Sequence, residues 1–324
     1  MINWLRLVKM EKKGQFNFVW LFAIIAGAAI LALAVFGAIK AGDTQRYASD
    51  TMAAKSISIL TEPLQAGFSE GSFGSIVFRQ ETRITNLCIN DGEFGKNDLS
   101  VATRSGVGKE WNSAGGATSI HNKYIFSEEN EEGREYYVFS KPFYFPYKVT
   151  DTIYLTTRNY CFVNAPESVE EELTALDMPN VEVENCSSSS EKVCFGSGSD
   201  CDVLVLGSCS SQCDSIYEDG TVRKNEGDLE YATYALMYAA IFSDGEIYDC
   251  NVERIFYRTS RIADGLAEKA DLMDFRQCET NLKPDVLMWA DYTTNATSED
   301  LINLDLIAKS MERKNRGEIC GLWE

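Results

Sequence analysis

"VWLFAIIAGAAILALAVFGAI" occupies residues 19–39 and contains no charged side chain. As an α-helix these 21 residues would be about 31 Å long, which matches the hydrocarbon core of a bilayer. Basic residues precede the segment, at Arg6, Lys9, Lys12 and Lys13. Because such residues favour the cytoplasmic side, we expect a single-pass protein of the cell membrane, with its N-terminus in the cytoplasm and its C-terminal body outside the cell.

The remainder of the chain is acidic. The 324 residues have a formal net charge of −19, and residues 1–14 hold +3, so residues 15–324 hold −22. A body of this charge repels the phosphates of nucleic acids. We therefore expect the lipid bilayer as a partner and no nucleic acid.

Ten cysteines, an even number, all follow the apolar segment. Cysteines placed beyond an export signal indicate disulfides formed in an oxidising compartment. Zinc is the alternative, but the sequence contains no CxxC pair and its one histidine is His121. We expect disulfides, with no metal and no cofactor. The cysteines are Cys88, Cys161, Cys186, Cys194, Cys201, Cys209, Cys213, Cys250, Cys278 and Cys320.

The residues before the apolar segment, Lys12-Lys13-Gly14-Gln15, resemble the class III signal peptide of archaeal type IV pilins and archaellins. The resemblance covers about the first 50 residues. It implies an archaeal source and cleavage between Gly14 and Gln15, which leaves the apolar helix attached to the mature protein. It also implies assembly with similar subunits through that helix. Val19 stands where many of these proteins have glutamate. The alternative is an uncleaved signal anchor.

The helix is expected to continue beyond the membrane as a stalk. A stripe at helical spacing predicts this continuation, and a proline predicts its end near Glu62. Type IV pilins, which the N-terminus resembles, are also built with a membrane helix that continues as a stalk. We therefore divide the start of the chain into a leader, 1–14, and a helix with its stalk, 15–63. The stripe is Ala53, Ile57, Leu60 and Leu64, and the proline is Pro63.

Residues 64–227 have the composition of a β-rich, disulfide-bonded extracellular domain. β-Branched and aromatic residues recur in short runs separated by turn residues. Residues 192–195 and 202–206 flank a Gly/Ser/Asp turn and predict a hairpin, closed by a bridge between Cys194 and Cys201. Cys209 and Cys213 are close enough in sequence to close a small loop.

The segment 136–147 contains seven aromatic residues and two prolines within twelve positions. Such a segment could form a recognition surface, because aromatic side chains are enriched at interfaces. A pair of strands packed into the core is the alternative, with the prolines at an edge or bend. We favour the core.

Residues 228–324 predict a helical extracellular domain. Residues 232–242 are uncharged but too few to span a bilayer, so they indicate a buried helix. The capping-box sequence Ser243-Asp244-Gly245-Glu246 predicts a second helix that reaches Cys278 before a proline-containing break. A third helix is expected over 298–313.

Three helices in this order constrain the cysteines. Cys250 and Cys278 would lie about 42 Å apart on one helix, too far to pair. If the third helix returns antiparallel to the second, Cys320 ends beside Cys250. We therefore predict a Cys250–Cys320 bridge, and we expect Cys278 to pair with the β-rich part.

No motif identifies catalytic residues. His121 lies alone in a polar segment, and no serine stands in a GxSxG motif. Asn295, in Asn295-Ala296-Thr297, matches the acceptor pattern for N-glycosylation.

The sequence as a whole predicts an α+β protein with a long N-terminal transmembrane and stalk helix, a β-rich middle region and a helical C-terminal region. The expected function is that of a non-enzymatic, pilin-like subunit of a surface assembly, of the minor pilin or pseudopilin type. One alternative is an uncleaved ectodomain that binds a ligand or a partner cell. An anchored hydrolase is a remote alternative.

Overall fold

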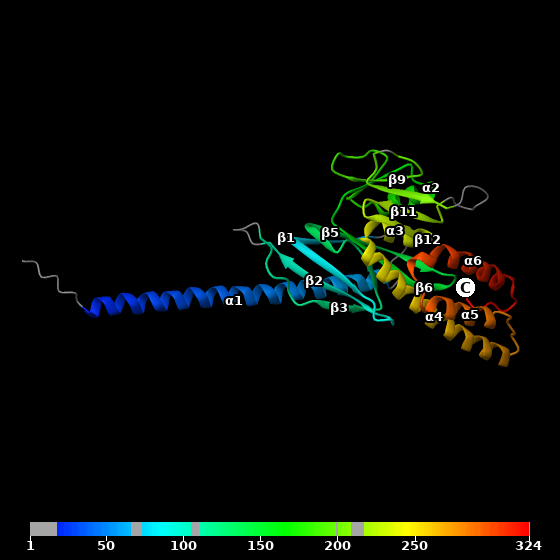
Figure 1. Ribbon diagram of the computed structural model, residues 1–324, viewed down its shortest axis with the longest axis horizontal. Helices are drawn as coiled ribbons and strands as arrows, with labels where there is room; N and C mark the ends of the chain where they lie inside the picture. The colour runs from blue at the N-terminus through cyan, green and yellow to red at the C-terminus, as the bar shows by residue number, and fades with distance from the viewer. Residues whose placement is uncertain (1–17, 66–72, 105–109, 199, 209–216, 324) are drawn as a thin grey trace, which may run out of the picture. The chain divides into compact units, whose positions relative to one another are not determined.

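The computed structural model describes residues 18–65, 73–104, 110–198, 200–208 and 217–323. These residues fall into two units, 1–47 and 48–324. The chain is an α+β protein, as expected, and its elements are shown in Figure 1. The helices are α1 (Phe18–Gln65), α2 (Glu167–Leu176), α3 (Thr233–Phe242), α4 (Gly245–Phe275), α5 (Lys283–Thr294), the short η1 (Ser298–Asp300) and α6 (Leu301–Gly317).

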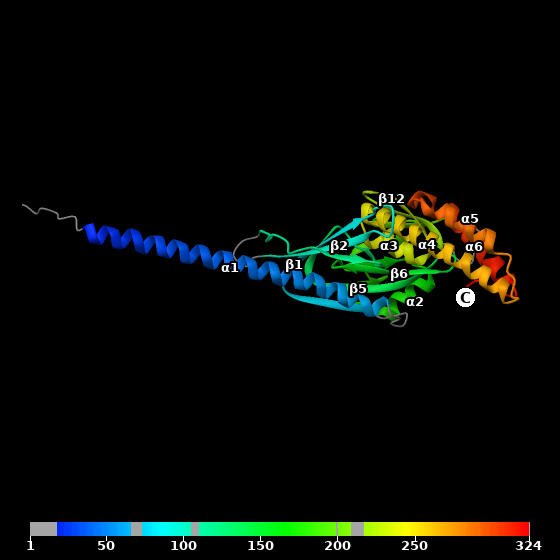
Figure 2. The ribbon, with the colours of Figure 1, turned by 90° about the horizontal axis from the view of Figure 1, so that it is seen from below.

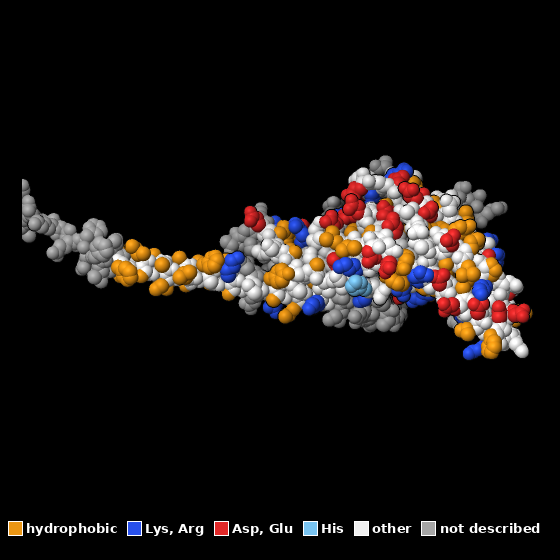
Figure 3. Space-filling view, turned by 60° about the horizontal axis from the view of Figure 1, so that its bottom comes forward, with side chains coloured by type: hydrophobic (Ala, Val, Ile, Leu, Met, Phe, Trp, Pro, Cys, Tyr) orange, Lys and Arg blue, Asp and Glu red, His pale blue; other side chains and the backbone are white. Residues whose placement is uncertain are grey.

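The first unit contains residues 18–47 of α1. Among the described residues, α1 is the one helix that is long and apolar enough to cross a membrane. Its side chains are open to the surroundings, with Phe22 72% and Leu33 70% exposed. Figure 3 shows these hydrophobic side chains along the helix. An exposed apolar surface of this length fits a lipid environment, because its exposure to water would be unfavourable in free energy.

The second unit begins with the remainder of α1, which continues to Gln65. The predicted continuation is therefore confirmed, and the helix ends three residues beyond the expected end at Glu62. Ala54 is fully buried against a sheet. The Thr51 hydroxyl accepts a hydrogen bond of 2.9 Å from the backbone N–H of Gly116. The side chains of the other predicted stripe residues, Ile57, Leu60 and Leu64, lie outside the described part.

The first sheet has the strand order β3-β2-β1-β5-β6-β4 and is antiparallel except for the β4–β6 pair. Successive side chains of a strand point to opposite faces. On β5, Tyr136 and Val138 pack on the side of Ala54, whereas Tyr137 and Phe139 join the larger core. The 48–65 part of α1 lies against this sheet in Figures 1 and 2. The strands are β1 (Phe73–Ile89), β2 (Lys96–Thr103), β3 (Thr118–His121), β4 (Tyr124–Phe126), β5 (Asn130–Tyr144) and β6 (Lys148–Thr156).

The second sheet has the order β12-β11-β10-β9-β7-β8. The predicted hairpin is wrong, because β9 and β10 are neighbours but run parallel, with Val193 opposite Val203. The segment between them carries the chain back to the start of β9, where the Asp202 carboxylate and N–H both bond the backbone of Lys192. The strands are β7 (Tyr160–Val163), β8 (Val181–Val183), β9 (Glu191–Phe195), β10 (Val203–Gly207), β11 (Asp219–Lys224) and β12 (Gly227–Ala232).

Helix α3 lies between the two sheets and is buried on all sides from Ala235 to Phe242. The ring of Phe242 lies 5.5 Å from that of Phe139 in the first sheet and 4.7 Å from that of Tyr160 in the second. The two predicted extracellular domains, 64–227 and 228–324, therefore share one core within a single unit. A helix that is apolar all round cannot form a separate surface layer, because every face of it must be covered.

The aromatic segment 136–147 belongs to the core, as favoured. Phe139, Phe143 and Phe145 are at most 2% exposed, and Tyr144 is the exposed exception at 50%. Pro146 follows a cis peptide bond in the turn between β5 and β6. This segment packs against α3, α4 and α5 rather than offering a continuous aromatic surface.

The C-terminal helices correct the predicted cysteine pairing. A helix that was not expected, α5, packs along α4 and reverses the chain. Helix α6 consequently starts near the beginning of α4, where Ser298 donates to Asp249, and ends beside Lys269, which donates to the carbonyl of Leu322. Cys320 therefore pairs with Cys278. The predicted Cys250–Cys320 bridge is wrong because the extra helix inverts the direction of α6. The expected pairing of Cys278 with the β-rich part is wrong for the same reason, and it is Cys250 that bonds β1, through Cys88.

Candidate functional site

The structure confirms some of the site residues predicted from the sequence and does not describe others. Gly14, Gln15, Cys209 and Cys213 lie outside the described residues. The predicted Cys194–Cys201 bridge is confirmed. Asn295 is exposed directly after α5, so the structure leaves it accessible to a modifying enzyme. The disulfides among the described residues are Cys88–Cys250, Cys161–Cys186, Cys194–Cys201 and Cys278–Cys320.

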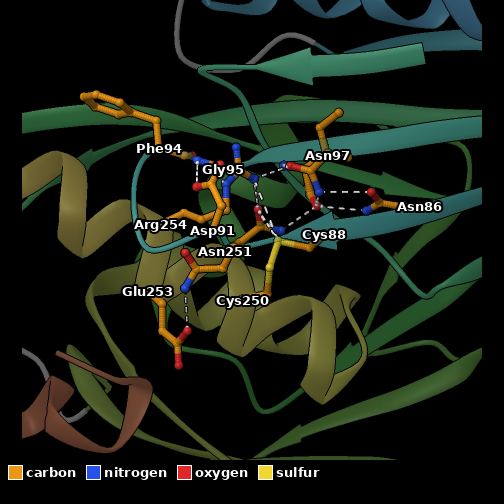
Figure 4. The surroundings of a disulfide bond; sticks show 12 residues. Asn86, Cys88, Asp91, Phe94, Gly95, Asn97, Cys250, Asn251, Glu253 and Arg254 are labelled. Carbon is orange, nitrogen blue, oxygen red and sulfur yellow. Dashed lines mark hydrogen bonds between the residues drawn. A yellow bond between two sulfur atoms is a disulfide. The ribbon is translucent and has the colours of Figure 1, made fainter. Parts of the chain in front are cut away.

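A buried polar cluster surrounds the Cys88–Cys250 disulfide and joins α4 to the β1–β2 hairpin (Figure 4). Arg254 is fully buried at its centre. Its Nη1 donates to the side-chain oxygens of Asn97, at 2.6 Å, and Asn251, at 2.7 Å. Its Nε donates to the carbonyl of Phe94 at 2.8 Å, and its Nη2 to that of Lys123 at 3.2 Å.

None of these partners carries a formal charge. The guanidinium lies 4.9 Å from the ring centre of Tyr124, where the negative face of the ring attracts it. Burial lowers the pKa of Arg254 to about 10, with Tyr124 and Asp91 acting in the opposite direction. The bond to Asn251 stays within α4, but the other three reach β2 at Asn97, the β1–β2 loop at Phe94 and the β3–β4 loop at Lys123, so the cluster fixes α4 on the first sheet. Its geometry indicates a structural role.

Gly95 makes room for this arginine. Its φ of +54° is left-handed, and an added Cβ would lie 2.9 Å from Nε of Arg254 and 2.2 Å from the carbonyl of Ile89. Only glycine fits both restrictions. The Asn90-Asp91-Gly92 turn before it is closed by Asp91, which accepts hydrogen bonds from the N–H groups of Glu93 and Gly95.

A charged pocket of about 430 Å³ is lined by residues that follow β4 and β6 of the first sheet, by the start of β9 and by the turn between β11 and β12 of the second sheet. Glu128 and Asp244 are adjacent carboxyl groups beside it, and Arg158 pairs with Glu128 at 3.2 Å. Burial and the hydrogen bond with Asp244 raise the pKa of Glu128 to about 8 against the opposing effect of Arg158. Burial lowers the pKa of Lys224, which donates to the carbonyl of Ser243. Opposed charges in a cleft are typical both of binding sites and of structural ion pairs.

A larger pocket, about 760 Å³, lies beside α6. Four separate parts of the chain line it: the β5–β6 turn, the residue before β11, the start of α3, and α6 with the C-terminal tail. Its aromatic lining is Tyr144, Phe145, Tyr234 and Trp323. Its acidic lining is Glu218, Asp305, Glu312 and Glu318, and its basic lining is Lys309 and Arg316.

The cations of this pocket are paired within it. Lys309 lies 2.8 Å from Oδ2 of Asp305 and 3.0 Å from Oε2 of Glu218. Arg316 pairs with Glu312. Burial raises the pKa of the Asp305 carboxyl, against the effect of Lys309. The pocket therefore presents carboxylates in excess of cations.

Two features of the lining carry a free-energy cost. Thr233 has a φ of +71°, which is strained for a β-branched residue. Its hydroxyl and the indole N–H of Trp323 are buried and have no hydrogen-bond partner among the described residues. Unpaired buried polar atoms call for a physical explanation, and a ligand is one. Pockets of this size with aromatic walls and a few polar groups are typical of ligand sites.

The sequence carried no signal for this pocket. Its residues come from positions 144 to 323 and share no motif. The cluster around Arg254 was equally invisible, since asparagines and one arginine are common on any surface. A comparison of the chain with family models, with curated proteins and with solved structures found no match.

Proposed function

We propose that this chain is a membrane-anchored subunit of a pilin-like surface assembly, of the minor pilin or pseudopilin type. The observation that carries the proposal is α1. The helix runs without interruption from an apolar segment to Gln65, and its part within the second unit packs against the first sheet of that unit through Ala54. Among the described residues, α1 is the one helix long and apolar enough to span a bilayer, which indicates membrane anchoring, and the disulfides indicate an extracellular body.

The finer parts of the proposal rest on the leader, Lys12-Lys13-Gly14-Gln15. In this proposal a membrane peptidase removes residues 1–14 and Gln15 becomes the first residue. The N-terminus lies in the cytoplasm, because the basic residues precede the span. The partners are the lipid bilayer and similar subunits that contact the apolar helix. The protein has no catalytic role and binds no nucleic acid.

The test is the intact mass of the protein extracted from membranes of its own or a related host. A mass that begins at Gln15 supports the proposal. Gly14→Ile should abolish cleavage, and Gly42→Ile is the matched control, since nothing lies within 4 Å of a Cβ at Gly42. A retained leader in the unmodified chain would favour the alternative, an uncleaved ectodomain that binds a ligand.

Orientation is tested separately, with protease added to intact cells. Digestion of residues beyond 65 supports an extracellular body. Complete protection, combined with protein thiols that react with alkylating reagents without prior reduction, would contradict the proposed location.

A further inference from the structure

We propose that the pocket beside α6 binds a neutral carbohydrate, a short oligosaccharide with one ring placed on Tyr144. This inference goes beyond anchoring and assembly, and it holds whether or not the leader is cleaved. It rests on the composition, charge and strain of the pocket.

The charge of the pocket excludes an anionic ligand as the preferred occupant. Four carboxyl groups line it against two cations, and both cations already have carboxylate partners. An anion would have to displace one of these partners and would meet the remaining carboxylates. The acidic surface of the whole chain acts in the same direction.

A cationic ligand is disfavoured for a related reason. The position between Asp305 and Glu218 is already occupied by the ammonium group of Lys309. A second cation at this position would meet that ammonium at short range. The carboxylates nevertheless keep free lone pairs, so they can accept hydrogen bonds from hydroxyl groups.

The aromatic residues supply the other half of sugar recognition. The C–H face of a pyranose ring is apolar and packs on an aromatic ring, while its hydroxyls bond to carboxylate, amide and indole groups at the edge. Tyr144 is 50% exposed in a strand whose other aromatic residues are nearly all buried. Its neighbours in the lining, Tyr234 and Trp323, come from other elements.

The costs noted above fit this ligand class. The unpaired hydroxyl of Thr233 and the unpaired N–H of Trp323 offer an acceptor and donors to sugar hydroxyls, provided that small movements expose them. Thr233 is held in its strained backbone by a 2.6 Å hydrogen bond from its own N–H to the carbonyl of Glu218, another residue of the lining. Strain of this kind persists where the surrounding structure maintains it, as at ligand sites.

The experiment uses the full chain in detergent with its disulfides intact. Neutral trisaccharides built from glucose, mannose or N-acetylglucosamine are titrated by calorimetry and by tryptophan fluorescence, up to about 20 mM. We expect at least one to bind. Tyr144→Ala should weaken that binding about tenfold, the loss expected for one ring contact. Tyr144→Trp should restore it.

Tyr292→Ala is the matched control, because Tyr292 is 48% exposed on α5 and is not part of the pocket lining. It should leave the affinity unchanged, and both alanine variants should keep the thermal midpoint of the unmodified chain. The proposal is overturned if none of the trisaccharides binds, or if both alanine variants lose affinity equally. Tighter binding of glucose 6-phosphate or of spermine than of any neutral sugar would also overturn it.

Discussion

Cys88 and Cys250 are bonded to each other across 162 positions of sequence, with their Cα atoms 6.0 Å apart. The bond joins the end of β1 to the second turn of α4, and Arg254 lies one helical turn further along the same helix. The disulfide and the buried guanidinium thus both fix the N-terminal part of α4 on the first sheet.

This disulfide should contribute more stability than any short-range one. In the chain-entropy description, a closed loop of this length stabilises the fold by about 5 kcal/mol, against about 2 kcal/mol for the loop closed by Cys194 and Cys201. We predict these losses in the free energy of unfolding for the Cys88→Ser/Cys250→Ser and Cys194→Ser/Cys201→Ser double variants. Urea titration of the detergent-solubilised chain measures both. Equal losses would contradict the topological argument.

Arg254→Met should destabilise the protein by about 3 kcal/mol or more, because it removes the guanidinium that donates to the side-chain oxygens of Asn97 and Asn251 and to the carbonyls of Phe94 and Lys123. The control is Arg223→Met. Arg223 pairs with Asp228 on the surface, where solvent screens the pair, so its loss should change stability little. Denaturant titration compares the two variants, and a cost below that of the control would show that the buried cluster is dispensable.

The variants Gly95→Ala and Gly92→Ala distinguish the stability lost to backbone strain from the stability lost to steric overlap. Both glycines have positive φ, but a Cβ at Gly92 meets nothing within 4 Å. Both variants should lose about 1 kcal/mol from the backbone conformation. Gly95→Ala should lose about 2 kcal/mol more, since its Cβ overlaps the carbonyl of Ile89 and approaches Arg254. Thermal unfolding of the two variants side by side checks this, and indistinguishable midpoints would refute it.

Glu128 should make stability depend on pH. Its folded pKa of about 8 lies above the ordinary value of 4.5, so the folded state binds the proton more tightly than the unfolded state does. The resulting stabilisation is fully present below about pH 4.5 and is lost as the pH rises through about 8. Burial and Asp244 raise the pKa of Glu128, whereas the charges of Arg158 and Lys224 lower it.

We therefore predict that Glu128→Gln flattens the decline of the thermal midpoint between pH 5 and pH 9. Asp228→Asn is the control. Arg223 lowers the pKa of Asp228 below its ordinary value of 3.8, so this variant should change the profile only in more acidic solution. An unchanged slope in Glu128→Gln would show that another group titrates in this range.

Local patterns were sufficient to predict individual elements. The uncharged run predicted the apolar part of α1, and the short uncharged segment before Ser243 predicted α3 as a buried helix. The second helix was predicted from a capping-box sequence, and it is present. Its expected cap is absent, however, because Ser243 donates to Ala239 and Asp244 accepts from the N–H of Glu129.

At Pro284 a local pattern gives the wrong expectation, and the error extends to the predicted pairing of distant cysteines. The sequence predicts a break at this proline after the second helix, but Pro284 occupies the first turn of α5, where proline fits without losing a hydrogen bond. The unexpected helix reversed the direction of α6. Cys320 therefore reached Cys278, and Cys250 paired with Cys88.

The sequence by itself determined the apolar span, the α+β composition and the disulfide-forming character of the body, because each depends on the type or local spacing of neighbouring residues. Tertiary structure alone decided the parallel pairing of β9 with β10, the sharing of one core by both halves of the body, the partners of Arg254 and the pocket beside α6. In each of these the residues that meet are separated by several elements or by a turn whose direction is not encoded locally. Their contact depends on how whole helices and sheets cover one another's apolar faces.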